Sequence, residues 1–387
     1  MEWKSAEILD GRVKVPSTWL HLHYYEALSI LFRFENALRL FVYVILKQHL
    51  GKDWDLASLG EGSIRSETRK RINDAKKYGY LGYEVSSPML FLSGGELTAL
   101  IGHDAYWKYF ARYFKASKEI VLSKLLEIGT VRNALAHFRP VKEDDIDLIK
   151  QNTRHILLSI EDCLVQLTSI TDIVPTNSAE RWYSELKSIG AGFASTVLMS
   201  SKDENWIRAS LRYEMPTLRM SMRDTYLNAT VANLRAHRIL LKWPDLKDWV
   251  IYLSESKPHP EIQGTGMSAV KAVSLVFARS DLVESLDAIV GILRQIALQV
   301  ESETQLLQTD NLARGDLVDS QSLTGSRKDE DARWSFNTGK LDPPVGLVDD
   351  VEYWGQRYHF GTGFVASTTT YPWMPATVSN DDDDIPF

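Results

Sequence analysis

The polar residues of the stretch "TVRNALAHFRP" are spaced so that they could act together. Asn133 and His137 are four residues apart and share one face of a helix, while Arg132 lies about 100° around the axis, at the edge of that face. Histidine exchanges a proton near neutral pH, and arginine is a permanently charged, forked donor. Polar residues on an otherwise apolar helix either line a site or are satisfied internally. The alternative to a site is a core histidine bonded to a carboxylate, with Arg132 in an ordinary ion pair.

A second polar group lies in the segment "IRSETRKRINDAKK". The side chains that could follow a nucleic-acid backbone are Arg65, Arg69, Lys70 and Arg71. Acidic residues interrupt this run, so a solvated helix face is the alternative. His21 and His23 lack acidic partners at metal-ligand spacing, and the chain has no phosphate-binding glycine loop. We therefore expect no metal and no cofactor.

Helical periodicity dominates the first 170 residues and places the "RNALAH" motif on a long helix. The run "YYEALSILFRFENALRLFVYVILKQHL" has apolar residues at three- and four-residue spacings and predicts an amphipathic helix that ends near Gly51. Ser93 is predicted to cap a short helix that begins near Gly95. Two more long patterns, separated at Pro140, are "YWKYFARYFKASKEIVLSKLLEIGTVRNALAHF" and "EDDIDLIKQNTRHILLSIEDCLVQL". Residues 1–170 are thus predicted to form an antiparallel helical bundle.

Apolar patterns resume between residues 175 and 310. They include "MRDTYLNATVANLRAHRILLKW", "LKDWVIYLSES" and "SLVFARSDLVESLDAIVGILRQIALQVESETQLL", which we interpret as helices of a second domain of unknown role. From residue 311 onward the long periodicity ends and prolines and glycines become frequent, so residues 311–387 are predicted to be an irregular acidic tail. The predicted fold class is all-α.

Composition indicates a protein of two ordinary domains. The chain has 387 residues, 44% of them hydrophobic, and lacks the roughly 20 consecutive apolar residues of a membrane span. Its charged start does not resemble a secretory signal, so we expect a cytoplasmic protein. The lone cysteine, Cys163, forms no internal disulfide and is expected to be a buried thiol. The net charge of −7 arises entirely from residues 311–387, which leaves the preceding part able to bind a polyanion.

The motif and its helical context resemble the HEPN superfamily (higher eukaryotes and prokaryotes nucleotide-binding domains). The signature of that superfamily is an arginine, four to six residues of which the first is polar, and a histidine, matched here by Arg132, Asn133 and His137. The first predicted helix is similar to that of the subgroup found in RNA processing and bacterial defence, with Glu35 and Arg39 preceding an apolar run and "GKDW". The resemblance covers about residues 20–168.

The HEPN resemblance implies a metal-independent RNA endonuclease that acts as a homodimer, with one motif from each chain at a shared cleft. His137 would act as acid or base while the RNA 2′-OH attacks the phosphate, and Arg132 would stabilise the charge on that phosphate. Asn133 would orient the imidazole or hold the substrate backbone. Glu35 and Arg39 are candidate supports, although they could simply pair with each other at four-residue spacing. The expected products are a 2′,3′-cyclic phosphate and a 5′-hydroxyl.

The end of the chain, "DDDDIPF", is the other distinctive motif. Its residues are Asp381, Asp382, Asp383, Asp384, Ile385, Pro386 and Phe387. They closely resemble the C-terminal tip of the bacterial single-stranded-DNA-binding protein, which docks repair and replication enzymes. A terminal phenyl ring can fill an apolar pocket and its carboxylate can pair with a basic residue, while the aspartates would lie along a basic ridge. The alternatives are a solubilising acidic end and an appended fusion.

Two functional hypotheses follow from the sequence. The first is a bacterial HEPN ribonuclease of a toxin or anti-phage type, including abortive infection, whose tail engages a helicase, exonuclease or recombination mediator. The second is a non-catalytic helical adaptor or inhibitor that competes for the same replication and repair enzymes through the tail. RNA cleavage that depends on His137 would support only the first hypothesis.

Overall fold

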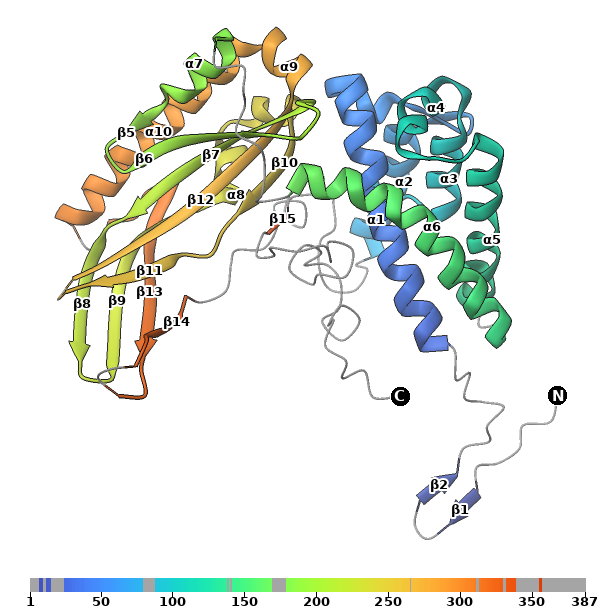
Figure 1. Cartoon of the computed structure of the whole chain (residues 1–387), viewed down its shortest axis with the longest axis horizontal. Coiled ribbons are helices and arrows are strands. Elements are labelled where there is room, and N and C mark those ends of the chain that lie inside the picture. Colours follow the sequence, from blue (N-terminus) through green and yellow to red (C-terminus); the bar gives the residue numbers. More distant parts are fainter. Residues whose placement is uncertain are drawn as a thin grey trace.

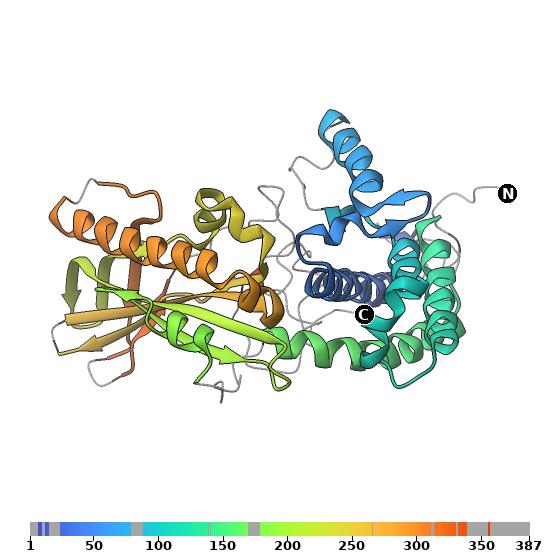
Figure 2. The same cartoon turned by 90° about the horizontal axis from the view of Figure 1, so that it is seen from above.

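A computed structural model gives the arrangement of the chain. It describes residues 7–9, 12–14, 24–78, 88–137, 139, 141–168, 179–264, 266–310, 313–329, 332–338 and 355–356. Residues 24–168 make up a part built mainly of helices, which we call the helical part. Residues 179–338, together with residues 355–356, make up a part built around large sheets, which we call the sheet part. The two parts lie side by side in both views (Figures 1 and 2).

Long helices form the framework of the helical part. They are α1 (Tyr24–Leu50), α2 (Ile64–Tyr78), α3 (Gly94–Gly102), α4 (Asp104–Phe110), α5 (Lys118–Ala136) and α6 (Glu143–Thr168). Shorter elements join them: the 3₁₀ helices η1 (Gly51–Leu56), η3 (Pro88–Phe91) and η4 (Ala111–Tyr113), and the hairpin β3 (Ser58–Leu59) with β4 (Gly62–Ser63). A further pair, β1 (Glu7–Leu9) and β2 (Arg12–Lys14), precedes α1.

Helix α3 begins where the sequence predicts, whereas α5 begins later than predicted. The Ser93 hydroxyl accepts a hydrogen bond from the Glu96 N–H, and the Glu96 carboxylate accepts one from the Ser93 N–H, so Ser93 is the predicted cap. The region before the motif was predicted to be one long helix. It breaks instead between α4 and α5, where Phe114 has an extended backbone and is largely buried.

Strands dominate the sheet part. The seven-stranded sheet has the order β15-β10-β12-β7-β6-β5, with β11 also paired to β12, and the four-stranded sheet has the order β14-β13-β9-β8. The strands are β5 (Gly190–Ala191), β6 (Ala194–Ser200), β7 (Trp206–Met215), β8 (Thr217–Arg223), β9 (Tyr226–Leu234), β10 (Val250–Glu255), β11 (His259–Gln263), β12 (Gly266–Ala278), β13 (Val318–Ser326), β14 (Ser335–Asn337) and β15 (Gly355–Gln356). The helices here are α7 (Arg181–Lys187), α8 (Ala236–Lys242), η5 (Pro244–Asp248), α9 (Arg279–Glu284) and α10 (Leu286–Thr309).

The all-α prediction is therefore wrong, and the chain as a whole is not a helical bundle. The region from 175 to 310, predicted to be helical, supplies six strands of the seven-stranded sheet and two strands of the four-stranded sheet. The predicted irregular tail also begins too early, because β13 and β14 fall within residues 318–337. Apolar side chains at alternate positions bury one face of a strand just as those at three- and four-residue spacings bury one face of a helix. Short apolar runs between residues 175 and 310 that we interpret as helices from the sequence form strands in the structure.

Two hydrophobic cores hold the structure together. One lies between the seven-stranded sheet, the four-stranded sheet and α10, which covers the sheet part along its length (Figure 1). The other fills the helical part and includes Trp206, Tyr252 and Val276 of the sheet part, so the two parts share it. Lys47 of α1 reinforces this contact, since its Nζ donates to the Lys247 carbonyl at 2.6 Å. Within the described residues, none of the helices combines the length and apolar character that a membrane crossing requires.

Candidate functional site

A cavity in the helical part receives part of the predicted motif. It has a volume of about 320 Å³ and lies among α1, the start of α3 and α5. Arg132 and Asn133 reach it from the last turn of α5, and Glu35 reaches it from α1. Leu31, Phe34 and Leu125 contribute an apolar lining. Two of the predicted catalytic residues and one predicted support are thus brought together.

Glu35 is the anchor of this site. Its carboxylate accepts a hydrogen bond from Arg39 and also pairs with Arg132, whose Nε lies 3.5 Å from Oε2. Arg39 is fixed further by donating to the Leu92 carbonyl at 3.0 Å and to the Asn36 side chain at 3.0 Å. One carboxylate therefore serves two guanidinium groups, and the three side chains together keep one positive charge.

Exposure separates the roles of the two arginines. The Arg39 side chain is 13% exposed, whereas that of Arg132 is 38% exposed. Arg39 is thus committed to tying α1 to the segment before α3. Arg132 can still reach an anion from solvent, and the forked shape of a guanidinium suits phosphate oxygens.

A glycine permits the close approach of α3 to this anchor. A Cβ atom added to Gly94 would lie 3.3 Å from Oε2 of Glu35, closer than most side chains tolerate. Ser93 and Gly94 line the cavity together with Thr98 on the next turn. Ser93 is the cap that the sequence predicts, but its position at the cavity was not predicted. The doublet "GG" beside the cap was the sequence feature that could have indicated this close approach, because glycine often marks close packing.

His137 lies at the end of α5 and outside the cavity lining. It is the C-cap residue, its backbone N–H donates to the Asn133 carbonyl at 3.2 Å, and its side chain is exposed. No hydrogen bond to its ring occurs among the described residues, so it is not the core histidine of the alternative interpretation. The ion pair of Arg132, in contrast, is what that interpretation expected.

The basic segment forms α2, but its cations differ in their surroundings. Arg65 donates two hydrogen bonds to Asp55, both at 2.7 Å, and this bonding raises the pKa of Arg65. Arg71 is bonded to Glu96 at 2.6 and 2.8 Å, which likewise raises the pKa of Arg71. Arg69 and Lys70 are exposed. Half of the predicted RNA-binding residues are therefore held in ion pairs.

The docking peptide predicted at residues 381–387 lies outside the residues that the structure describes. Across the described ranges, no three side chains of histidine, cysteine, aspartate or glutamate gather closely enough to hold a metal ion. Comparison of the chain with models of protein families, with curated proteins and with solved structures found no match. Function is therefore inferred from the chemistry of the side chains.

Proposed function

We propose that the protein is an RNA endonuclease whose active site includes Arg132, Asn133 and His137. The observation that carries this proposal is the cavity in which the half-exposed guanidinium of Arg132, held by Glu35, lies beside Asn133. One cationic donor that is both tethered and accessible is what a phosphodiester needs as charge develops on its oxygens. The resemblance of these residues to the HEPN signature supports the same function.

The proposed reaction uses the RNA as its own nucleophile. A proton leaves the 2′-OH for a base as its oxygen attacks the adjacent phosphorus. The bond from phosphorus to the 5′-oxygen breaks, and that oxygen takes a proton. His137, exposed one turn beyond Asn133, is the group placed to exchange these protons. The products are a 2′,3′-cyclic phosphate and a 5′-hydroxyl, and no metal is required.

A homodimer would complete the site. A single chain supplies one copy of the motif, so a second set of cationic and imidazole groups must come from another chain. Leu126 supports this arrangement, because it borders the cavity on α5 and its side chain is 63% exposed. An apolar residue beside a polar site suits contact with a second copy. The exposed Arg69 and Lys70 would add to the attraction for RNA.

RNA cleavage tests the catalytic proposal directly. Purified full-length protein would be incubated with end-labelled RNA in the presence of EDTA. His137→Ala and Arg132→Ala are each expected to slow cleavage by about 10²-fold or more. Arg139→Ala is the matched control, because Arg139 is an exposed arginine only two residues beyond His137. Cleavage by His137→Ala at the parent rate would remove the catalytic assignment.

The second candidate function is a non-catalytic adaptor that binds replication and repair enzymes through its terminal peptide. The ion pair between Arg132 and Glu35 favours it, because such a pair also serves a purely structural purpose. Deleting Phe387 should abolish binding of a protein that recognises the tail of the single-stranded-DNA-binding protein under both proposals. Loss of RNA cleavage in His137→Ala with tail binding intact supports only the endonuclease.

A further inference from the structure

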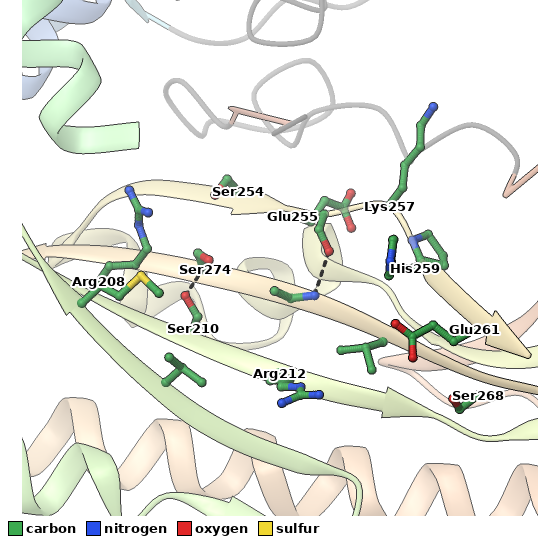
Figure 3. Close-up of a pocket in the computed structure, with 16 residues that line it drawn as sticks. Arg208, Ser210, Arg212, Ser254, Glu255, Lys257, His259, Glu261, Ser268 and Ser274 are labelled. Atoms are coloured by element: carbon green, nitrogen blue, oxygen red, sulfur yellow. Dashed lines mark hydrogen bonds between the residues drawn. The ribbon is translucent and has the colours of Figure 1, made fainter. Parts of the chain in front are cut away.

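A larger hollow lies in the sheet part, away from the site just described. Its volume is about 670 Å³, and side chains of β6, β7, β10, β11 and β12 line it (Figure 3). Arg208, Ser210 and Arg212 of β7 point into it, whereas the alternate residues Ile207 and Leu211 belong to the core beneath α10. Because successive strand residues face opposite sides, the hollow occupies the face of the sheet turned away from α10.

A row of serines forms the floor of this hollow. Ser210, Ser274 and Ser254 stand opposite one another on three neighbouring strands, and the Ser210 and Ser274 hydroxyls are 2.7 Å apart (Figure 3). Their exposures are 9%, 6% and 2%. Central strands usually present large β-branched or aromatic side chains. Small serine side chains at the centre of the sheet leave space for a ligand, and their hydroxyls can form hydrogen bonds with it.

Basic side chains flank the serine row on both sides along the strands. Arg208 is 4% exposed and lies on one side, while Lys257 and His259 lie on the rim on the other side (Figure 3). Arg212 lines the hollow between them and is exposed. Such an arrangement favours an anion that reaches the buried arginine and is closed off at the rim.

The buried acidic group of the hollow, Glu255, is already paired. Glu255 is matched by Lys271, whose Nζ lies 2.6 Å from its carboxylate and whose side chain is 1% exposed. Lys271 is held in turn by the Leu234 carbonyl at 2.7 Å, on the core side of the sheet. Glu261 remains as an exposed carboxylate on the rim. The buried carboxylate of the hollow is thus already matched by a lysine, and the exposed Arg212 faces a ligand.

We propose that this hollow binds a phosphate-bearing small molecule of nucleotide size. Its volume falls within the roughly 300–1,000 Å³ typical of small-molecule sites. Arg208 and Arg212 would take the phosphate, because guanidinium groups bind phosphate oxygens bidentately. The serine row would bind sugar or base hydroxyls and amides. Val197, Met199 and Val270 supply an apolar surface for a ring.

Calorimetric titration of the full-length protein tests this proposal. The probes are AMP, ATP, adenosine and inorganic phosphate. We expect AMP or ATP to bind, adenosine to bind at least tenfold more weakly, and inorganic phosphate to compete. Arg212→Ala should weaken binding about tenfold, which corresponds to about 1.4 kcal/mol. Ser274→Val should remove most binding, because a methyl group replaces a hydroxyl on the floor.

Controls keep the outcomes separable from misfolding. Arg219→Ala alters an exposed arginine on β8, in the four-stranded sheet, and should leave the titration unchanged. Thermal melting of each variant checks that the fold persists. The proposal is overturned if neither AMP nor ATP binds at millimolar concentration, if adenosine binds as tightly as AMP, or if Arg212→Ala and Ser274→Val both bind like the parent.

Discussion

Glu96 joins two helices next to the candidate site. The effect of its replacement by glutamine on the free energy of unfolding can be calculated. Its carboxylate accepts hydrogen bonds from Arg71 of α2 at 2.6 and 2.8 Å and from the Ser93 N–H at 2.8 Å. Partial burial opposes ionisation of Glu96, but the bonds from Arg71 and Ser93 outweigh it and lower the pKa of Glu96 from 4.5 to about 2. Charge on Glu96 therefore stabilises the start of α3.

The sign and size of the effect follow from this pKa. Because the folded-state pKa of Glu96 is the lower one, its stabilisation is complete above about pH 4.5 and is lost as the pH falls towards 2. This difference between the unfolded and folded pKa of Glu96 sets an upper limit of about 3.4 kcal/mol on the stabilisation. The Arg71 side chain is 40% exposed, so solvent screening reduces the expected contribution to about 1–2 kcal/mol at pH 7. About three fifths of it should remain at pH 3.5.

Urea unfolding at several pH values measures this contribution, since urea does not screen charges as guanidinium chloride does. Glu96→Gln should be less stable than the parent by about 1–2 kcal/mol at pH 7, and the gap should narrow below pH 4.5. Hydrogen exchange of the Leu97 amide, which donates to the Ser93 carbonyl, reports the same loss locally. Glu61→Gln is the control, because Glu61 is exposed in a turn. A stability gap that is the same at pH 7 and pH 3 would refute the reasoning.

Three further changes probe other parts of the chain. Lys271→Met should lower the free energy of unfolding by about 3–5 kcal/mol because it strands the buried Glu255, and adding Glu255→Met should recover most of the loss in the same urea assay. Gly315→Ala should cost about 1–3 kcal/mol in thermal unfolding, because the new Cβ would clash with the Glu303 carboxylate and the Val318 carbonyl. Glu35→Gln should slow RNA cleavage at least tenfold with an unchanged far-ultraviolet dichroism spectrum, because it weakens the anchor of the site arginine.

The helices of the first half could be predicted because their apolar residues are periodic over long runs. The sequence of strand β7 contains an equally clear periodic pattern, which predicts a strand. Its apolar residues Ile207, Leu211 and Tyr213 alternate with Arg208 and Arg212, which is the sequence period of a half-buried strand. This alternation also predicts that both arginines lie on one face of a sheet. That face lines the hollow in the structure.

Other strands gave no such signal. All six residues of β10 are buried, so "VIYLSE" reads as a short apolar run with no alternation. The last four residues of β9, Val231–Leu234, are buried in the same way. Periodicity cannot distinguish a short run of this kind from a helix segment, because both faces are covered by other parts of the protein. The covering elements lie far away in the sequence, and local patterns do not report them.

The sequence of α1 gives the strongest indication that a sheet, which the all-α prediction omitted, packs against this helix. Residues 40–46, "LFVYVIL", are each at most 1% exposed, so this stretch is apolar on every side. A helix of that kind must be enclosed completely, and the helical part covers only some of its faces. Tyr252 of β10 and Trp206 of β7 join the core that covers the rest. The N-terminal half of α1 carries Glu35 of the candidate site, and its C-terminal half is buried against the sheet part. The two parts therefore depend on one helix, and substitutions that enlarge side chains between α1 and β10 should disturb both.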